Sequence, residues 1–219
     1  MTISVLVVDE ERIFADAVAA QLEAEQDIEV VAAVDPGTNG EFLRAGRHAD
    51  VVLLDADLAD DAANTLCQEL IRLGSRVIML SDTTGPERIV ASLRAGASGW
   101  VRKDESFEYL LNVVRGTMRG ETWLPPCETG TVLQLLMRAQ RQQQEDDSLL
   151  AALTPREREV LACLADGDGR RDVAERLYLS ANTVRTHLQN LMAKLGVHSS
   201  LEAVALIRRT QLAEAYRDD

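Results

Sequence analysis

Short apolar runs that end in acidic residues constrain the fold of this chain more than any other feature. One run, VVLLDAD, leads into Asp55 and Asp57, and an earlier one, ISVLVVDEE, leads into Asp9 and Glu10. A carboxylate at the end of a buried strand is costly unless water or another group compensates its charge. Either the strands reach the surface there, or their acidic ends form one site.

Five short apolar runs, these two among them, alternate with segments whose apolar residues recur at helical spacing. The runs are Ser4–Val8, Ile28–Val34, Val51–Leu54, Arg76–Leu80 and Gly99–Val101. Short, continuously apolar strands that alternate with helices predict an α/β fold built on a parallel sheet. With the flavodoxin-like strand order 2-1-3-4-5, strands 1 and 3 are neighbours, and ligands bind beyond their carboxyl ends.

In that topology Asp9, Glu10 and Asp55 lie together in one crevice. Converging carboxylates repel one another unless a cation lies among them, and oxygen ligands in a small site favour Mg²⁺. A carboxylate beside a metal ion can accept a phosphoryl group. The last two strands lead to Ser81 and Lys103, whose hydroxyl and ammonium groups suit phosphoryl oxygens. A role as a turn cap would explain Ser81 alone, and a solvated surface charge would explain Lys103 alone. Neither role explains why both residues follow strands of the same sheet.

Charge divides the chain into two parts. Residues 1–126 carry 22 acidic and 11 basic residues, whereas residues 151–219 carry 10 of each. The net charge of −13 argues against binding of nucleic acid to the whole surface, but not to the second part. The three cysteines are far apart and odd in number, and no apolar run reaches the length of a membrane span. We therefore expect a cytoplasmic protein without a membrane partner.

The residues after 150 carry the punctuation of short helices. Thr154 and Glu157 have capping-box spacing, Ser180 suits the cap of a later helix, and Gly196 suits its end. Residues 176–201 contain no acidic side chain. Two helices joined by a tight turn, the second rich in hydrogen-bond donors, predict an all-α helix-turn-helix domain. A generic helical bundle would share the same caps.

These segments resemble two known domains. The runs VVDE, VVLLD, MLS and RAGASGWVRKD resemble the receiver domain of two-component response regulators. The run LTPREREVL, followed by DVAERLYLSANTVRTHLQNLMAKLGV, resembles the LuxR-type DNA-binding domain, so the chain is similar to a NarL/FixJ-class response regulator. The resemblance implies a receiver at residues 1–122, a partly helical linker at 123–149 and a helix-turn-helix domain at 150–219. We expect the linker helix to fray within its polar run QRQQQEDD.

In the receiver, the resemblance implies a phosphoacceptor, a Mg²⁺ site, two phosphoryl contacts and a switch aromatic residue. The phosphoacceptor would be Asp55, and the Mg²⁺ site would consist of Asp9, Glu10 and Asp55 with the backbone carbonyl of Asp57. The phosphoryl contacts would be Ser81 and Lys103, and the switch aromatic residue would be Trp100. Because Trp is bulkier than the usual Tyr or Phe, we expect Trp100 to pack poorly in its inward position. The loop after Asp55 lacks the usual Pro and Gly, and Asp82 follows Ser81, which predicts slow phosphorylation.

In the second domain, the resemblance implies that residues 182–195 form the recognition helix for double-stranded DNA. The base-reading residues would be Arg185, Thr186 and Gln189. The phosphate contacts would be Arg170, Arg171, Thr183 and Lys194. The resemblance also implies a cognate sensor histidine kinase as a partner and a homodimer on DNA.

Two other functions fit parts of the sequence. VVLLDAD also resembles the nucleophile motif of haloacid-dehalogenase-type phosphatases, in which Asp55 would attack phosphorus and Asp57 would act as general acid. That family places the motif on its leading strand, whereas here another acid-ended strand precedes it. The second alternative is a regulator of the same architecture that is switched by a ligand or protein partner instead of phosphate. The unusual loop after Asp55 favours this alternative.

Overall fold

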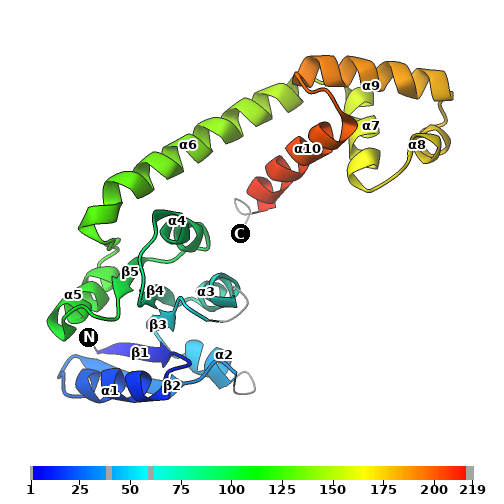
Figure 1. The fold of residues 1–219 in the computed structure, drawn as a ribbon. Coiled ribbons are helices and arrows are strands. Elements are labelled where there is room, and N and C mark those ends of the chain that lie inside the picture. Colours follow the sequence, from blue (N-terminus) through cyan, green and yellow to red (C-terminus); the bar gives the residue numbers. More distant parts are fainter. Residues whose placement is uncertain (1, 38–40, 59–61, 216–219) are drawn as a thin grey trace. The chain divides into compact units, whose positions relative to one another are not determined.

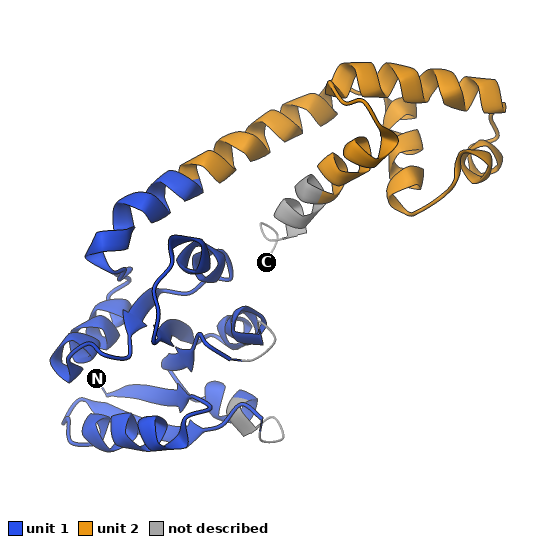
Figure 2. Ribbon diagram, in the orientation of Figure 1, with its two compact units in different colours: residues 1–136 blue, residues 137–219 orange. Residues whose placement is uncertain are grey.

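The structure is a computed structural model in which residues 2–37, 41–58 and 62–215 are described. The chain divides into two compact units, residues 1–136 and 137–219 (Figure 2). Each unit has a hydrophobic core of its own. Within the described residues, no helix is both long enough and apolar enough to cross a membrane.

The first unit is built on a five-stranded parallel sheet with the predicted order β2-β1-β3-β4-β5 (Figure 1). The strands are β1 (Ile3–Val8), β2 (Ile28–Val34), β3 (Val51–Asp55), β4 (Arg76–Ser81) and β5 (Gly99–Arg102). Every residue of the central strand β3 is buried, as its continuous apolar run predicts. The flavodoxin-like α/β fold class is therefore confirmed.

Helices cover both faces of this sheet. The helices are α1 (Arg12–Leu22), α2 (Glu41–Gly46), α3 (Ala62–Arg72), α4 (Pro86–Arg94) and α5 (Phe107–Met118). One core lies between the sheet and α1 and α5, and the other lies between the sheet and α2, α3 and α4. Successive side chains of a strand point to opposite faces, so Leu53 and Leu54 belong to different cores.

Helix α6 (Pro126–Ala151) occupies most of the expected linker. Near its start Val132 is fully buried in the core that contains Trp100 and Ile89. The polar run that we expected to fray is helical instead. Two side-chain hydrogen bonds at i,i+4 spacing support it, from Gln142 to Asp146 at 3.0 Å and from Gln143 to Asp147 at 2.9 Å.

The described part of the second unit contains four further helices. They are α7 (Pro155–Ala165), α8 (Arg170–Arg176), α9 (Ala181–Leu195) and α10 (Ser200–Ala215). The predicted capping box is present at α7, where the Thr154 N–H donates to Glu157 at 2.8 Å and Thr154 Oγ1 accepts from the Glu157 N–H. Ser180 caps α9, and Gly196 ends it with a φ of 67°. A tight turn at Tyr178, whose φ is 54°, joins α8 to α9.

The three cysteines are free thiols. Cys67 and Cys163 are buried among core residues, whereas Cys127 is exposed near the start of α6. Burial raises the pKa of Cys67 to about 12, so this thiol is a packing residue.

Candidate functional sites

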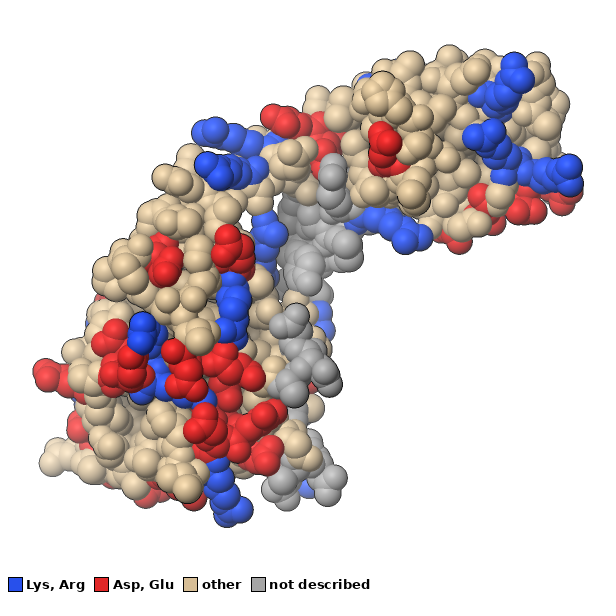
Figure 3. Space-filling view, viewed as in Figure 1, with Lys and Arg blue, Asp and Glu red and all other residues tan. Residues whose placement is uncertain are grey.

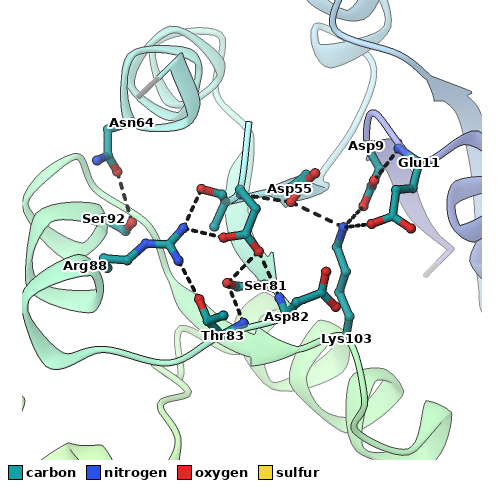
Figure 4. Close-up of polar contacts among 12 residues, drawn as sticks. Asp9, Glu11, Asp55, Asn64, Ser81, Asp82, Thr83, Arg88, Ser92 and Lys103 are labelled. Carbon is teal, nitrogen blue, oxygen red and sulfur yellow. Dashed lines mark hydrogen bonds and ion pairs between the residues drawn. The ribbon is translucent and has the colours of Figure 1, made fainter. Parts of the chain in front are cut away.

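Two buried carboxylates and one ammonium group meet beyond the carboxyl ends of β1, β3 and β5 (Figure 4). Asp9 is 1% exposed and Asp55 is 4% exposed. Lys103 Nζ lies 2.9 Å from Asp9 Oδ2 and 3.4 Å from Asp55 Oδ1. Parallel strands place their carboxyl ends at one edge, which is why residues so distant in sequence converge here.

Local hydrogen bonds hold the two carboxylates in place. The Glu11 N–H donates to Asp9 Oδ1 at 2.8 Å, and the Asp57 N–H donates to Asp55 Oδ1 at 2.9 Å. In both cases an aspartate accepts from the backbone two residues ahead, an Asx turn. The loop after each strand therefore fixes the carboxylate at the end of that strand.

The electrostatics of this cluster of side chains favour a cation. Burial raises the pKa of Asp9, and the nearby charge of Asp55 acts in the same direction, against the hydrogen bond from Lys103. Burial alone would lower the pKa of Lys103, but the hydrogen bond to Asp9 and the charge of Asp55 raise it overall. Lys103 is therefore charged and supplies the positive group between two carboxylates.

Glu10, which the resemblance implies is a metal ligand, is exposed. Its neighbour Glu11, to which no role was assigned from the sequence, approaches Lys103 with 3.5 Å between Oε1 and Nζ. The DEE run signals acidic residues here, but only the loop geometry decides that Glu11, whose side chain is still 65% exposed, is the glutamate that approaches Lys103.

The donor set of this cluster suits Mg²⁺. Among the described residues, no group of three or more His, Cys, Asp or Glu side chains is placed to hold a metal ion. Mg²⁺ needs fewer protein ligands than that, since it binds through one or two carboxylates and retains several waters. The buried carboxylates Asp9 and Asp55 provide those hard oxygen ligands.

A second cluster surrounds the carboxylate of Asp57. Its Oδ2 accepts hydrogen bonds from Ser81 Oγ at 2.8 Å and from the Asp82 N–H at 2.9 Å. Its Oδ1 accepts from Arg88 Nη2 at 2.5 Å (Figure 4). Arg88 also donates to Thr83 Oγ1 at 2.7 Å and to the backbone carbonyl of residue 56 at 2.9 Å. The predicted phosphoryl contact Ser81 is therefore engaged by the side chain of Asp57, of which the receiver resemblance uses only the backbone carbonyl.

The surroundings of Asp57 keep it ionised. Burial pushes its pKa up, but the hydrogen bonds from Arg88, the Asp82 N–H and Ser81 outweigh burial and leave its pKa lowered. A general acid needs a raised pKa, so this carboxylate is poorly suited to protonate a leaving group.

Trp100 lies beside this cluster. The Arg88 guanidinium is 5.5 Å from the centroid of its ring, within the range of a cation–π contact. Trp100 is 2% exposed and shares a hydrophobic core with Ile89, Val90 and Val132. Residues of α4 and of the start of α6 belong to this core, but the buried indole Nε1 of Trp100 has no hydrogen-bond partner among the described residues. The expectation that its bulk makes the inward position of the phosphorylated state hard to pack stays a prediction.

In the second unit, α9 separates an apolar face from a polar one. Its buried residues are Val184, Leu188, Leu191 and Leu195. The predicted base-reading residues Arg185, Thr186 and Gln189 are all exposed, as 3.6-residue periodicity requires. The Thr186 hydroxyl donates to the backbone carbonyl of Asn182 at 3.1 Å. The exposed face thus carries a guanidinium and an amide that are available to a ligand.

The predicted phosphate-binding residues fall into two groups. Arg170 and Arg171 are exposed at the start of α8. Thr183 and Lys194 have partners within the unit. Thr183 Oγ1 lies 2.7 Å from Ser180 Oγ in the cap of α9, and Lys194 Nζ donates to Glu157 Oε2 at 2.7 Å.

The surface charges differ between the two units. In Figure 3, acidic side chains dominate the visible face of the first unit, whereas basic side chains are more prominent at the α8 and α9 end of the second. A phosphate-rich ligand binds more favourably to a basic surface than to an acidic one.

Comparisons with known proteins agree with both halves. The family described as "Response regulator receiver domain" matches residues 5–115, and "Bacterial regulatory proteins, luxR family" matches residues 151–207. The chain is 28% identical to the transcriptional regulatory protein LiaR of Bacillus subtilis, over 96% of this chain and 99% of that protein. It is 29% identical to the nitrate/nitrite response regulator protein homolog of Haemophilus influenzae, over 93% and 95% of the two chains. A solved two-component response regulator of the LuxR family from Aurantimonas is 20% identical, with a TM-score of 0.54 over 63% of this chain and 99% of that one. That similarity supports the fold alone.

Proposed function

Because the chain belongs to the response regulators that join a receiver domain to a LuxR-type DNA-binding domain, we propose that it regulates transcription under the control of a phosphoryl group on Asp55. One observation carries the choice of Asp55. It is a buried carboxylate at the end of the central strand, with an ammonium group 3.4 Å away. A carboxylate nucleophile needs such a cation to offset the charge of the incoming group.

A sensor histidine kinase is the proposed phosphodonor. An oxygen of Asp55 attacks the phosphorus of a phosphohistidine, the P–N bond breaks, and the imidazole leaves and takes up a proton from solvent. Lys103 and Ser81 then bind oxygens of the aspartyl phosphate. When bound, Mg²⁺ neutralises phosphoryl charge. The residues proposed to hold it are Asp9, Asp55 and the backbone carbonyl of Asp57, whereas the side chain of Glu10, which the resemblance adds to this set, is exposed.

Intact mass after incubation with Mg²⁺ and acetyl phosphate tests the phosphoacceptor. The wild type should gain the mass of one phosphoryl group, and Asp55→Asn should gain none. Asp16→Asn is a matched control, because Asp16 is an exposed aspartate that pairs with Arg12 on α1. Labelling of Asp55→Asn to the wild-type extent would show that the nucleophile is another residue.

The second domain is proposed to bind double-stranded DNA as a homodimer. Arg185 suits bidentate pairing with guanine and Gln189 suits adenine, and both lie on the exposed face of α9. Arg170 and Arg171 are the proposed phosphate contacts at the exposed start of α8. Two copies of one recognition helix imply a two-part operator.

The phosphatase alternative is weakened by the setting of Asp57. Its carboxylate is held by Arg88 and Ser81, and its pKa is lowered, so it lacks the proton that a general acid donates. The alternative in which phosphate is not the switch has one specific observation in its favour. Ser81 and the Asp82 N–H are already hydrogen-bonded to a carboxylate of the chain itself.

A further inference from the structure

The carboxylate of Asp57 lies among the kinds of donor that bind a phosphoryl group. It accepts from a hydroxyl, a backbone N–H and a guanidinium, which belong to Ser81, Asp82 and Arg88. Hydroxyls, backbone N–H groups and arginine forks are the usual ligands of phosphate oxygens in proteins. Each oxygen of this carboxylate therefore takes a position that is chemically suited to a phosphoryl oxygen.

Ser81 cannot serve two anions at once. A serine hydroxyl has one proton to donate, and here it is directed to Asp57 Oδ2 at 2.8 Å. A phosphoryl group on Asp55 would have to replace Asp57 as the acceptor of this hydrogen bond from Ser81. Otherwise the phosphoryl group would lack its contact with Ser81. The two neighbouring anions would also repel each other, since Asp57 follows Asp55, the last residue of β3, by two positions.

The contacts continue from Asp57 to the buried aromatic residue. Arg88 joins them, with Nη2 2.5 Å from Asp57 Oδ1 and its guanidinium 5.5 Å from the Trp100 centroid. The bonds from Arg88 to Thr83 and to the carbonyl of residue 56 fix the guanidinium plane. Trp100 in turn shares its core with Val132 of α6, the helix that leads out of the receiver.

We propose that the Asp57 carboxylate is a built-in anion that occupies the phosphoryl-binding donors of this receiver and, through Arg88, holds Trp100 in its buried position. The inference rests on the proposed function in that Asp55 is the competing phosphoacceptor. The inference goes beyond the proposed function in two respects. Asp57 sets the position of the switch residue in the unmodified chain, and it opposes the phosphorylation of Asp55.

Three variants test this in the full-length protein. Asp57→Ala removes the anion, Asp57→Asn keeps its shape without its charge, and Arg88→Gln removes the link to Trp100. Arg102→Gln is the matched control, because Arg102 is also a partly exposed arginine with an aspartate partner, Asp104. The Asn variant retains an acceptor for Ser81 and guards against misfolding of the Ala variant.

The first measurement reads Trp100 without any phosphodonor. In a Trp123→Phe background, Trp100 is the remaining tryptophan, so acrylamide quenching reports on it alone. Asp57→Ala and Arg88→Gln should make Trp100 more accessible to acrylamide, Asp57→Asn should do so to a smaller extent, and Arg102→Gln should not. Unchanged quenching in both Asp57→Ala and Arg88→Gln would overturn the proposal.

The second measurement adds Mg²⁺ and beryllofluoride, a phosphoryl mimic, and follows both quenching and labelling. Wild-type quenching should hardly change, whereas the mimic should restore low quenching in Asp57→Ala. Asp57→Ala should also be labelled by acetyl phosphate about tenfold faster than wild type, the effect expected from removing one strong charge-assisted competitor. A large fall in wild-type quenching with the mimic would overturn the proposal.

The two proposals fail in distinguishable ways. If Trp100 responds to Asp57→Ala but no variant is ever labelled at Asp55, the built-in anion is upheld and the phosphoacceptor is wrong. If Asp55 is labelled at the same rate in wild type and Asp57→Ala, and Trp100 is unaffected, the phosphoacceptor is upheld and the built-in anion is overturned.

Discussion

Replacing Lys194 with methionine should destabilise the second unit by about 1–3 kcal/mol. Lys194 Nζ donates to Glu157 Oε2 at 2.7 Å, and Glu157 is only 3% exposed. Without the ammonium group, the buried Glu157 carboxylate still accepts a hydrogen bond from the Thr154 N–H at 2.8 Å, but no positive charge lies beside it. Breaking a fully buried pair costs about 3–5 kcal/mol, but the Lys194 side chain is 37% exposed, so water compensates part of the loss.

The effect should depend on pH with a definite sign. The hydrogen bond from Lys194 is the largest cause of the lowered pKa of Glu157. A carboxylate with a lowered pKa in the folded state stabilises the fold above its unfolded value, here 4.5, and loses that contribution as pH falls through the folded value. The difference in unfolding free energy between wild type and Lys194→Met should therefore be largest near neutral pH and should disappear as the pH falls below about 4.5.

Urea unfolding with two probes measures this effect. Both tryptophans, Trp100 and Trp123, belong to the first unit, so their fluorescence is an internal control, while circular dichroism reports on all helices. Arg176→Met is the matched control, since Arg176 pairs with Asp166 and Asp168 at an exposed site and should cost at most about 1 kcal/mol. If Lys194→Met leaves the helical transition in place at neutral pH while it weakens DNA binding, the structural role of Lys194 is refuted.

Five further substitutions have clear expected outcomes. Arg185→Ala should cost about 1–3 kcal/mol on the preferred operator and blur preference at one base pair, measured by titration of operator variants. Val132→Ala should lower the free energy of unfolding of the first unit by about 1–2 kcal/mol, because Val132 is fully buried, whereas Leu133→Ala, at a site 53% exposed, should change it little. Gly116→Ala should destabilise the first unit by about 1–3 kcal/mol, because its Cβ would come within 2.3 Å of an indole nitrogen. Gly130→Ala should stabilise α6 by about 0.5–1 kcal/mol, because the added Cβ would meet no neighbouring atom within 4 Å. Urea unfolding measures the opposite effects of the two glycine substitutions.

The cluster of charged side chains at the carboxyl ends of the strands could be predicted because a parallel sheet repeats one geometry. Once apolar runs are assigned to strands, the residues at their carboxyl ends must meet at one edge, as Asp9, Asp55 and Lys103 do. The direction of each loop side chain beyond the strand is set by the loop backbone and could not be predicted in this way. The strand pattern could not tell that Glu10 is exposed while Glu11 approaches Lys103.

The cluster around Asp57 escaped prediction for a different reason. Arg88 reaches the carboxylate from α4, so the contact depends on where that helix packs on the sheet. Side-chain spacing along the sequence carries no such information. The exposed face of α9, in contrast, is a direct consequence of its 3.6-residue repeat, because burial of Val184 and Leu188 leaves Arg185 exposed.

The rarity of lysine in this chain is a signal that bears on both units. The chain has 23 basic residues, and only Lys103 and Lys194 are lysines. Each forms an ion pair with a buried carboxylate, Lys103 with Asp9 and Lys194 with Glu157. An ammonium is a compact charge on a long stem, whereas a guanidinium is a wide planar fork, so lysine suits the narrow space beside a buried acid. The resemblance assigned Lys194 to a DNA phosphate, and in the structure its acidic partner Glu157 competes with any such phosphate for its charge.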